Sequence, residues 1–143
     1  MHEPRGGGKV LVTEDNPLHM KIFALNLTYS GFSVVEAQNG ERGLELAHRE
    51  RPDLILVDLS LPKIDGWEMI RRMQEDDATK DIPIIVVSAR RPQDEAARAA
   101  MAQVAAYIAK PFDPEALMAL IQQTIHGRRQ ATGDRRQTDG SVP

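Results

Sequence analysis

Residues 53–58 read DLILVD and form the most apolar of the short segments that decide the fold. An uninterrupted apolar run of this length is typical of a strand that is buried on both faces of a sheet. Such strands occur almost only in parallel sheets, because helices cover both faces of those sheets. The segment therefore predicts an α/β fold in which Asp58 is the last residue of a buried strand.

Four other short segments rich in β-branched residues lie along the chain, and amphipathic or alanine-rich stretches separate them. The predicted strands are residues 10–13, 32–37, 53–58, 82–87 and 107–109. Five strands that alternate with helices predict a doubly wound, five-stranded parallel sheet with helices on both faces. A closed eight-stranded α/β barrel would need roughly twice this length.

The first predicted helix begins after Asn16, whose side chain can cap it, and ends at Gly31, which suits a left-handed cap. Its apolar face is predicted from four residues at helical spacing: Leu18, Ile22, Leu25 and Tyr29. The later helices are predicted at residues 40–50, 67–76, 92–101 and 114–126.

Composition excludes several classes of protein. The chain has 143 residues, 41% of them hydrophobic and 27% charged, as expected for one globular domain. The absence of cysteine excludes a disulfide framework, a zinc ribbon and a thiol nucleophile. A formal net charge of −3 argues against nucleic-acid binding. No apolar run can span a bilayer and no secretion signal follows Met1, so we expect no membrane insertion and a cytoplasmic location.

Both ends of the chain are predicted to be disordered. Residues 1–8 contain three consecutive glycines and form an expected flexible leader. Residues 127–143 are rich in arginine and contain no helical apolar stripe, so we expect a disordered tail there. The folded domain is accordingly expected to cover residues 9–126.

Polar and charged side chains follow four of the predicted strands: Glu14, Asp15, Asp58, Ser88 and Lys110. In open parallel sheets, functional sites lie at the carboxyl ends of the strands, so these residues are expected to converge. Neighbouring carboxylates repel one another without a cation, and they suit Mg²⁺. A lysine suits a phosphoryl oxygen. Together the residues predict a site that forms an aspartyl phosphate.

Four segments also resemble a known family: VLVTEDNPLHMKIF at 10–23, PDLILVDLSLPKIDGWE at 52–68, IPIIVVSA at 82–89 and AYIAKPF at 106–112. The chain resembles the receiver domain of two-component response regulators, the CheY-like fold. It is most similar to the stand-alone receivers of bacterial cell-cycle and polarity pathways. The resemblance implies the flavodoxin/CheY-like strand order 2-1-3-4-5.

The resemblance also implies roles for individual residues. Asp58 would accept a phosphoryl group from a histidine kinase or a histidine phosphotransfer protein. Asp15 and Asp58 would bind Mg²⁺ together with the backbone carbonyl of Ser60, and Glu14 would act through a water molecule. Lys110 would neutralise the phosphoryl oxygens.

A second group of implied roles concerns signalling after phosphorylation. Ser88 would hydrogen-bond the new phosphate and Tyr107 would move inward behind it, while the Lys110–Pro111 peptide bond is expected to be cis. The output would be protein–protein contact through the face formed by the helix at 92–101, the strand at 107–109 and the helix at 114–126. Apart from self-catalysed phosphoryl transfer and slow hydrolysis of the phosphate, no enzymatic activity is expected.

Two alternatives remain open at this stage. Gln103 replaces a glycine common in the family, and residues 90–94 form an unusual loop, so a phosphorylation-independent receiver-like interaction module is one alternative. A flavodoxin-like flavin carrier is the other. It would need a glycine- or serine-rich phosphate loop after the first strand, where Glu14 and Asp15 would instead repel phosphate.

Overall fold

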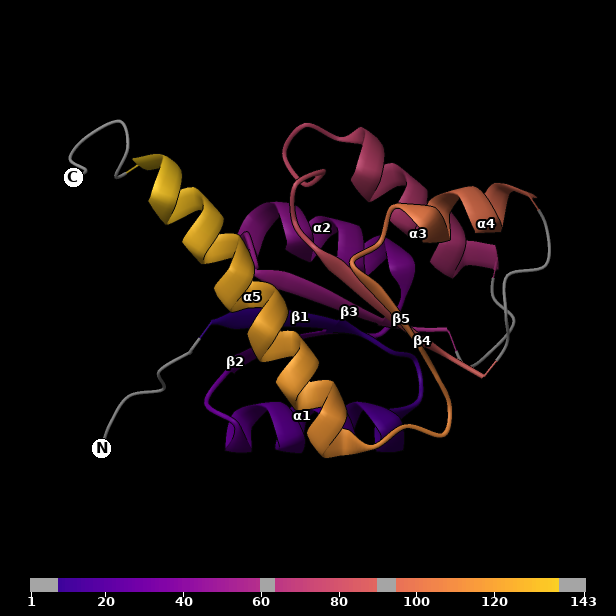
Figure 1. The fold of residues 1–143 in the computed structure, drawn as a ribbon. Coiled ribbons are helices and arrows are strands. Elements are labelled where there is room, and N and C mark those ends of the chain that lie inside the picture. Colours follow the sequence, from indigo (N-terminus) through magenta and orange to yellow (C-terminus); the bar gives the residue numbers. More distant parts are fainter. Residues whose placement is uncertain (1–7, 60–63, 90–94, 137–143) are drawn as a thin grey trace.

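The computed structural model describes residues 8–59, 64–89 and 95–136, which form one sheet covered by helices (Figure 1). Its strands are β1 (Lys9–Thr13), β2 (Ser33–Ala37), β3 (Leu54–Asp58), β4 (Ile84–Ser88) and β5 (Ala106–Ala109). Its helices are α1 (Pro17–Tyr29), α2 (Gly40–Glu50), α3 (Ile64–Glu75), α4 (Glu95–Ala102) and α5 (Pro114–Arg136). All neighbouring strands are parallel, in the order β2-β1-β3-β4-β5. The predicted fold class and strand order are confirmed.

Strand β3 lies at the centre of the sheet and all five of its residues are buried. Successive side chains of a strand point to opposite faces. Leu54 and Leu56 accordingly join the core beneath α1 and α5, whereas Ile55 and Val57 join the core beneath α2, α3 and α4. Figure 1 shows these two helical layers on either side of the sheet. The continuous apolar sequence of β3 therefore follows from its burial on both faces.

Helix α1 is capped as predicted. The Asn16 side chain accepts hydrogen bonds from the backbone N–H groups of Leu18 and His19, at 2.9 and 3.1 Å. Gly31 follows the helix with a φ of 97°, a left-handed conformation that favours glycine. These two residues fix where the helix begins and where the chain turns into β2.

The predicted apolar face of α1 is wrong. The four residues expected to face the core are exposed, by 64, 43, 62 and 94% respectively: Leu18, Ile22, Leu25 and Tyr29. The buried residues are instead Met20, Phe23 and Leu27, and Phe23 makes an edge-to-face contact with Phe112 at 5.6 Å. Because both sets are apolar and both have helical spacing, periodicity alone cannot identify the face that packs on the sheet.

Helix α5 continues to Arg136, whereas the sequence predicted a helix end near residue 126 and a disordered tail from 127. The added residues include several good helix formers, arginine, glutamine and alanine, which extend a helix without an apolar stripe. At the start of this extension the Arg128 side chain donates a 3.4 Å hydrogen bond to the Asp53 carbonyl. Across the described residues, none of the helices has the length and apolarity needed to cross a membrane.

The chain turns between α4 and β5 without the glycine that is common in the family. The backbone N–H of Gln103 donates to the Ala100 carbonyl at 3.2 Å, and that of Ala105 donates to the Ile84 carbonyl at 2.7 Å. Gln103 is not in the left-handed region, which among the described non-glycine residues only Arg51 occupies. The turn therefore forms without a positive φ. The predicted start of α4 at Pro92 lies outside the described residues.

Arg51 ends α2 in a left-handed conformation, with φ 47° and ψ 62°. Glycine adopts this conformation without the steric cost that a side chain brings, so Arg51→Gly is expected to raise the free energy of unfolding by about 0.5–1 kcal/mol. The matched variant Arg49→Gly, inside the helix, is expected to lower it by about 1 kcal/mol. Urea denaturation measures both changes. Equal destabilisation by the two glycines would contradict the prediction.

Candidate functional site

The carboxyl ends of β1, β3, β4 and β5 meet at one edge of the sheet. Glu14 directly follows β1, Asp58 and Ser88 are the last residues of β3 and β4, and Lys110 directly follows β5. Backbone hydrogen bonds hold Glu14 and Lys110 in place. The N–H of Glu14 donates to the Ala37 carbonyl at 2.9 Å, and the N–H of Lys110 donates to the Ser88 carbonyl at 2.9 Å. The sheet thus brings together four residues that are far apart in the sequence.

Asp58 forms an ion pair with Lys110, whose Nζ lies 2.9 Å from Asp58 Oδ2. The Asp58 side chain is fully buried, and that of Lys110 is 20% exposed. A buried carboxylate is costly unless a partner compensates its charge, and the ammonium group supplies this compensation. The ammonium group has three donor hydrogens and one is used on Asp58, which allows it to bind a second acceptor at the same edge.

Glu14 is 1% exposed and lies beside Asp58. Its Oε2 accepts a 2.8 Å hydrogen bond from Asn16 N–H, whereas its Oε1 has no hydrogen-bond partner. Burial, together with a hydrogen bond to Asp58 and the negative charge of that residue, raises the pKa of Glu14 to about 9. Without a metal, Glu14 therefore keeps its proton at neutral pH.

The residues at this edge fit a divalent cation. Glu14 and Asp58 place carboxylate oxygens close together, and one oxygen of Glu14 is buried without a partner. Carboxylate oxygens are the ligands that Mg²⁺ prefers in proteins. Asp15 lines the same cavity of about 50 Å³ as Glu14 and Asp58, together with Gly66. Ser60, the remaining predicted ligand, lies outside the described residues.

Ser88 and Tyr107 lie on the two strands next to this pair. The buried Ser88 hydroxyl donates a 3.1 Å hydrogen bond to the Leu59 carbonyl, at the start of the segment that follows β3. Tyr107 pairs with Val86 in the sheet and packs, half-buried, against the core under α2, α3 and α4. The Lys110–Pro111 peptide bond is cis, which confirms that prediction.

Two residues of the site were not predicted from the sequence. His19 belongs to no metal-binding motif of the sequence, but its Nδ1 lies 3.9 Å from Glu14 Oε1. The signal for it was the Asn16 cap, which places His19 in the first helical turn after Glu14. Gly66 allows α3 to approach the site closely, since a Cβ there would lie 2.1 Å from the Leu59 side chain.

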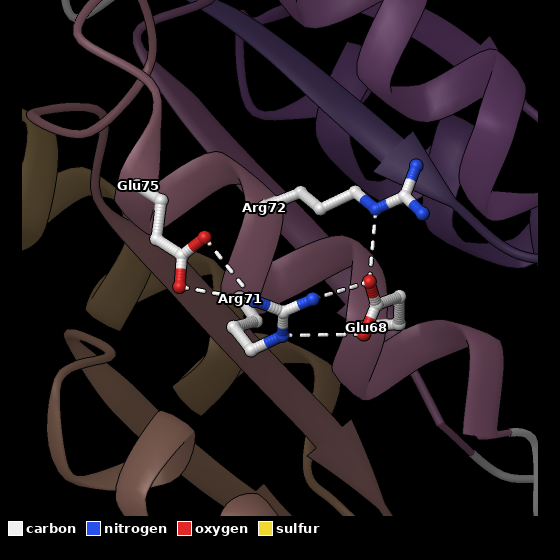
Figure 2. Close-up of polar contacts among 4 residues, drawn as sticks. All are labelled: Glu68, Arg71, Arg72 and Glu75. Atoms are coloured by element: carbon white, nitrogen blue, oxygen red, sulfur yellow. Dashed lines mark hydrogen bonds and ion pairs between the residues drawn. The ribbon is translucent and has the colours of Figure 1, made fainter.

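Four charged residues of α3 form a network of hydrogen bonds and ion pairs: Glu68, Arg71, Arg72 and Glu75 (Figure 2). Glu68 accepts hydrogen bonds from Arg71 and Arg72, and Arg71 also binds Glu75. The guanidinium groups hold the pKa of Glu68 below its usual value. Glu68 and Arg72 line a second, larger cavity of about 330 Å³ against α2. The carboxylates and guanidinium groups of this network are paired with one another, so we assign it no reactive role.

Comparison with known proteins agrees with this geometry. The family model described as the response regulator receiver domain matches residues 10–122. The polar-differentiation response regulator DivK of Brucella anthropi is 38% identical over 103 residues, which are 72% of this chain and 84% of DivK.

Two solved structures are also similar. One is the receiver domain of a Pseudomonas aeruginosa sensor histidine kinase, which was solved with a magnesium ion coordinated in its active-site cleft. Its TM-score is 0.72 and its sequence identity is 30%. The match covers 84% of this chain and 98% of that domain. The chemotaxis response regulator CheY4 of Vibrio cholerae has a TM-score of 0.70, covering 81% of this chain and 97% of that one. At 24% identity, the likeness to CheY4 shows the fold.

The raised pKa of Glu14 predicts how the stability of the metal-free protein depends on pH. Between the ordinary value of 4.5 and about 9, folded Glu14 keeps a proton that the unfolded chain releases. The free energy of unfolding should therefore fall as the pH rises, by at most about 1.4 kcal/mol per pH unit.

Urea denaturation in EDTA at several pH values within this range measures the dependence. Glu14→Gln, which is uncharged at every pH, should show a smaller decrease than the unsubstituted protein. The exposed control Glu45→Gln should follow the unsubstituted protein. The same pH slope in Glu14→Gln as in the unsubstituted protein would contradict the prediction.

Proposed function

This chain belongs to the family of response regulator receiver domains, and we propose that it is a single-domain response regulator which accepts a phosphoryl group on Asp58. Receiver domains are signalling switches. The donor would be a histidine kinase or a histidine phosphotransfer protein. The observation that carries the proposal is the buried Asp58 carboxylate, paired with Lys110 at 2.9 Å and adjacent to Glu14.

The proposed reaction is one phosphoryl transfer. A carboxylate oxygen of Asp58 attacks the phosphorus of a phosphohistidine, so that a P–O bond forms while the P–N bond breaks. The imidazole nitrogen leaves with the electron pair of that bond and takes up a proton from solvent. Lys110, already at Asp58, neutralises charge on the transferred phosphoryl oxygens. Apart from this transfer and slow hydrolysis, we propose no enzymatic activity.

We also propose ligands for a metal ion at this site. Asp15, Asp58 and the backbone carbonyl of Ser60 would hold Mg²⁺, and Glu14 would act through water. When bound, Mg²⁺ supplies positive charge that stabilises the phosphoryl oxygens. The buried carboxyl groups of Glu14 and Asp58 support this assignment, because a bound cation would compensate the charge of Asp58 and the charge that Glu14 acquires when it loses its proton.

The proposed output uses Ser88 and Tyr107. The Ser88 hydroxyl lies at the end of β4 beside the acceptor strand, where it would donate a hydrogen bond to the new phosphate. Tyr107, half-buried on β5, would move inward behind it. The surface of α4, β5 and α5 would then bind a downstream protein. Because the turn at Gln103 forms without glycine, that substitution no longer favours a phosphorylation-independent module.

Incubation with acetyl phosphate, followed by intact-mass measurement, tests the acceptor. We expect one phosphoryl adduct that requires Mg²⁺ and disappears in Asp58→Asn. Asp53→Asn, at the opposite end of β3, is the matched control and should retain the adduct. An adduct in Asp58→Asn would exclude Asp58 as the acceptor. A protein that takes up no phosphate from either acetyl phosphate or a histidine kinase would contradict the proposed function.

The exposed apolar residues of α1 support a docking role toward the phosphoryl donor. Leu18, Ile22 and Leu25 follow the helix away from Glu14 and Asp15. Between α1 and β2 lies a groove of about 370 Å³, lined by Asp15 and Leu25 among others. A protein that brings its histidine to Asp58 must cover this edge of the sheet. We infer that the donor covers the apolar residues of α1, because their burial stabilises the complex.

Leu25→Glu tests this surface. A charged side chain there should lower the rate of phosphorylation by a histidine kinase at least about tenfold relative to the rate with acetyl phosphate, since it places an unpaired charge in the interface. Ala99→Glu, exposed on α4, is the control and should leave the ratio of the two rates unchanged. A ratio unaffected by Leu25→Glu would exclude this part of α1 from the docking surface.

A further inference from the structure

His19 lies in the first turn of α1 and directs its Nδ1 toward the buried Glu14. The two atoms Nδ1 and Oε1 are 3.9 Å apart. Both are buried, and neither has a hydrogen-bond partner. Because buried polar atoms are nearly always satisfied, this local cluster is incomplete as it stands.

A cation would satisfy the nitrogen and the carboxylate oxygens together. One ligand atom each of Glu14, His19 and Asp58 lie within 4.8 Å of one another. In a tetrahedral zinc site with bonds of about 2.1 Å, ligand atoms are roughly 3.4 Å apart. The ligand atoms would have to move closer together by up to about 1.4 Å to bind one zinc ion. The unpartnered oxygen of Glu14, whose side chain is fully buried, lies 3.9 Å from His19 Nδ1.

We propose that His19 Nδ1, with the carboxylates of Glu14 and Asp58, forms a binding site for a divalent transition-metal cation of the zinc type. The proposal rests on the metal site at Asp58 described under the proposed function, and it adds a nitrogen ligand to that site. Imidazole is a good ligand for Zn²⁺, Ni²⁺ and Co²⁺, whereas Mg²⁺ prefers oxygen ligands and keeps several waters. His19 therefore selectively strengthens the binding of transition metals.

A comparison within the chain supports the choice of His19. His48 also contacts a carboxylate, at 2.7 Å from Asp76. Both of these side chains are substantially exposed, and Asp76 additionally accepts a hydrogen bond from Ala78 N–H. Within the described parts of the chain, no third histidine or carboxylate ligand completes a site around them. His48 thus provides a histidine–carboxylate pair on the surface that serves as a control.

Isothermal titration with Zn²⁺ and, separately, with Mg²⁺ measures the selectivity of the intact chain. We expect His19→Gln and His19→Ala to weaken Zn²⁺ binding at least about tenfold more than they weaken Mg²⁺ binding, since even the loss of a residue that orients a metal ligand costs about 10–100-fold. The absorption spectrum of bound Co²⁺ should change in both variants. His48→Gln and His126→Gln are the controls and should leave Zn²⁺ affinity and the Co²⁺ spectrum unchanged.

The titration also separates this inference from the proposed function. Asp58→Asn and Glu14→Gln should weaken Zn²⁺ binding as well. If these two variants do so and the His19 variants do not, a carboxylate metal site exists and the role of His19 is overturned. If Asp58→Asn leaves Zn²⁺ binding unchanged, zinc binds elsewhere and the inference also fails. Phosphorylation of Asp58 with Mg²⁺ and acetyl phosphate, measured independently, decides the proposed function.

Discussion

The burial of Asp58 is the constraint on which the arrangement of the site depends. Its carboxylate sits at the end of the central strand, fully buried, and an uncompensated charge there would destabilise the fold. Lys110 compensates it from β5, which is held in place because Lys110 N–H donates to the Ser88 carbonyl. The ion pair therefore depends on the pairing of β4 with both β3 and β5, which brings the ends of these strands together.

The sequence predicts which residues converge at the carboxyl ends of the strands. Apolar runs locate the strands, and in a parallel sheet all carboxyl ends share one edge, so residues next to those ends converge. The positions of Asp58, Ser88 and Lys110 next to strand ends are predicted in this way. The order of the strands was not accessible to the same reasoning, because pairing depends on contacts between distant segments. It came from the resemblance to receiver domains, and the observed sheet agrees with it.

Features that depend on orientation were not predictable. Helix α1 has apolar residues on two sides, and packing against α5, seen in the contact of Phe23 with Phe112, selects the buried one. The left-handed conformation of Arg51 had no glycine to signal it. His19 was missed for a related reason: its sequence spacing gives no metal motif, and only the start of α1 directly after β1 brings its ring to Glu14.

The hydrogen bond of Ser88 constrains how the proposed phosphorylation signal can leave the site. A serine hydroxyl has a single donor hydrogen, and here that hydrogen is directed to the Leu59 carbonyl at 3.1 Å. Donation to a phosphate on Asp58 would require the hydroxyl to release that carbonyl. Formation of the phosphate would therefore be coupled to the backbone after β3 as well as to β4. The hydroxyl would leave the Leu59 carbonyl for the phosphate because a charged phosphate is a stronger hydrogen-bond acceptor than a neutral carbonyl.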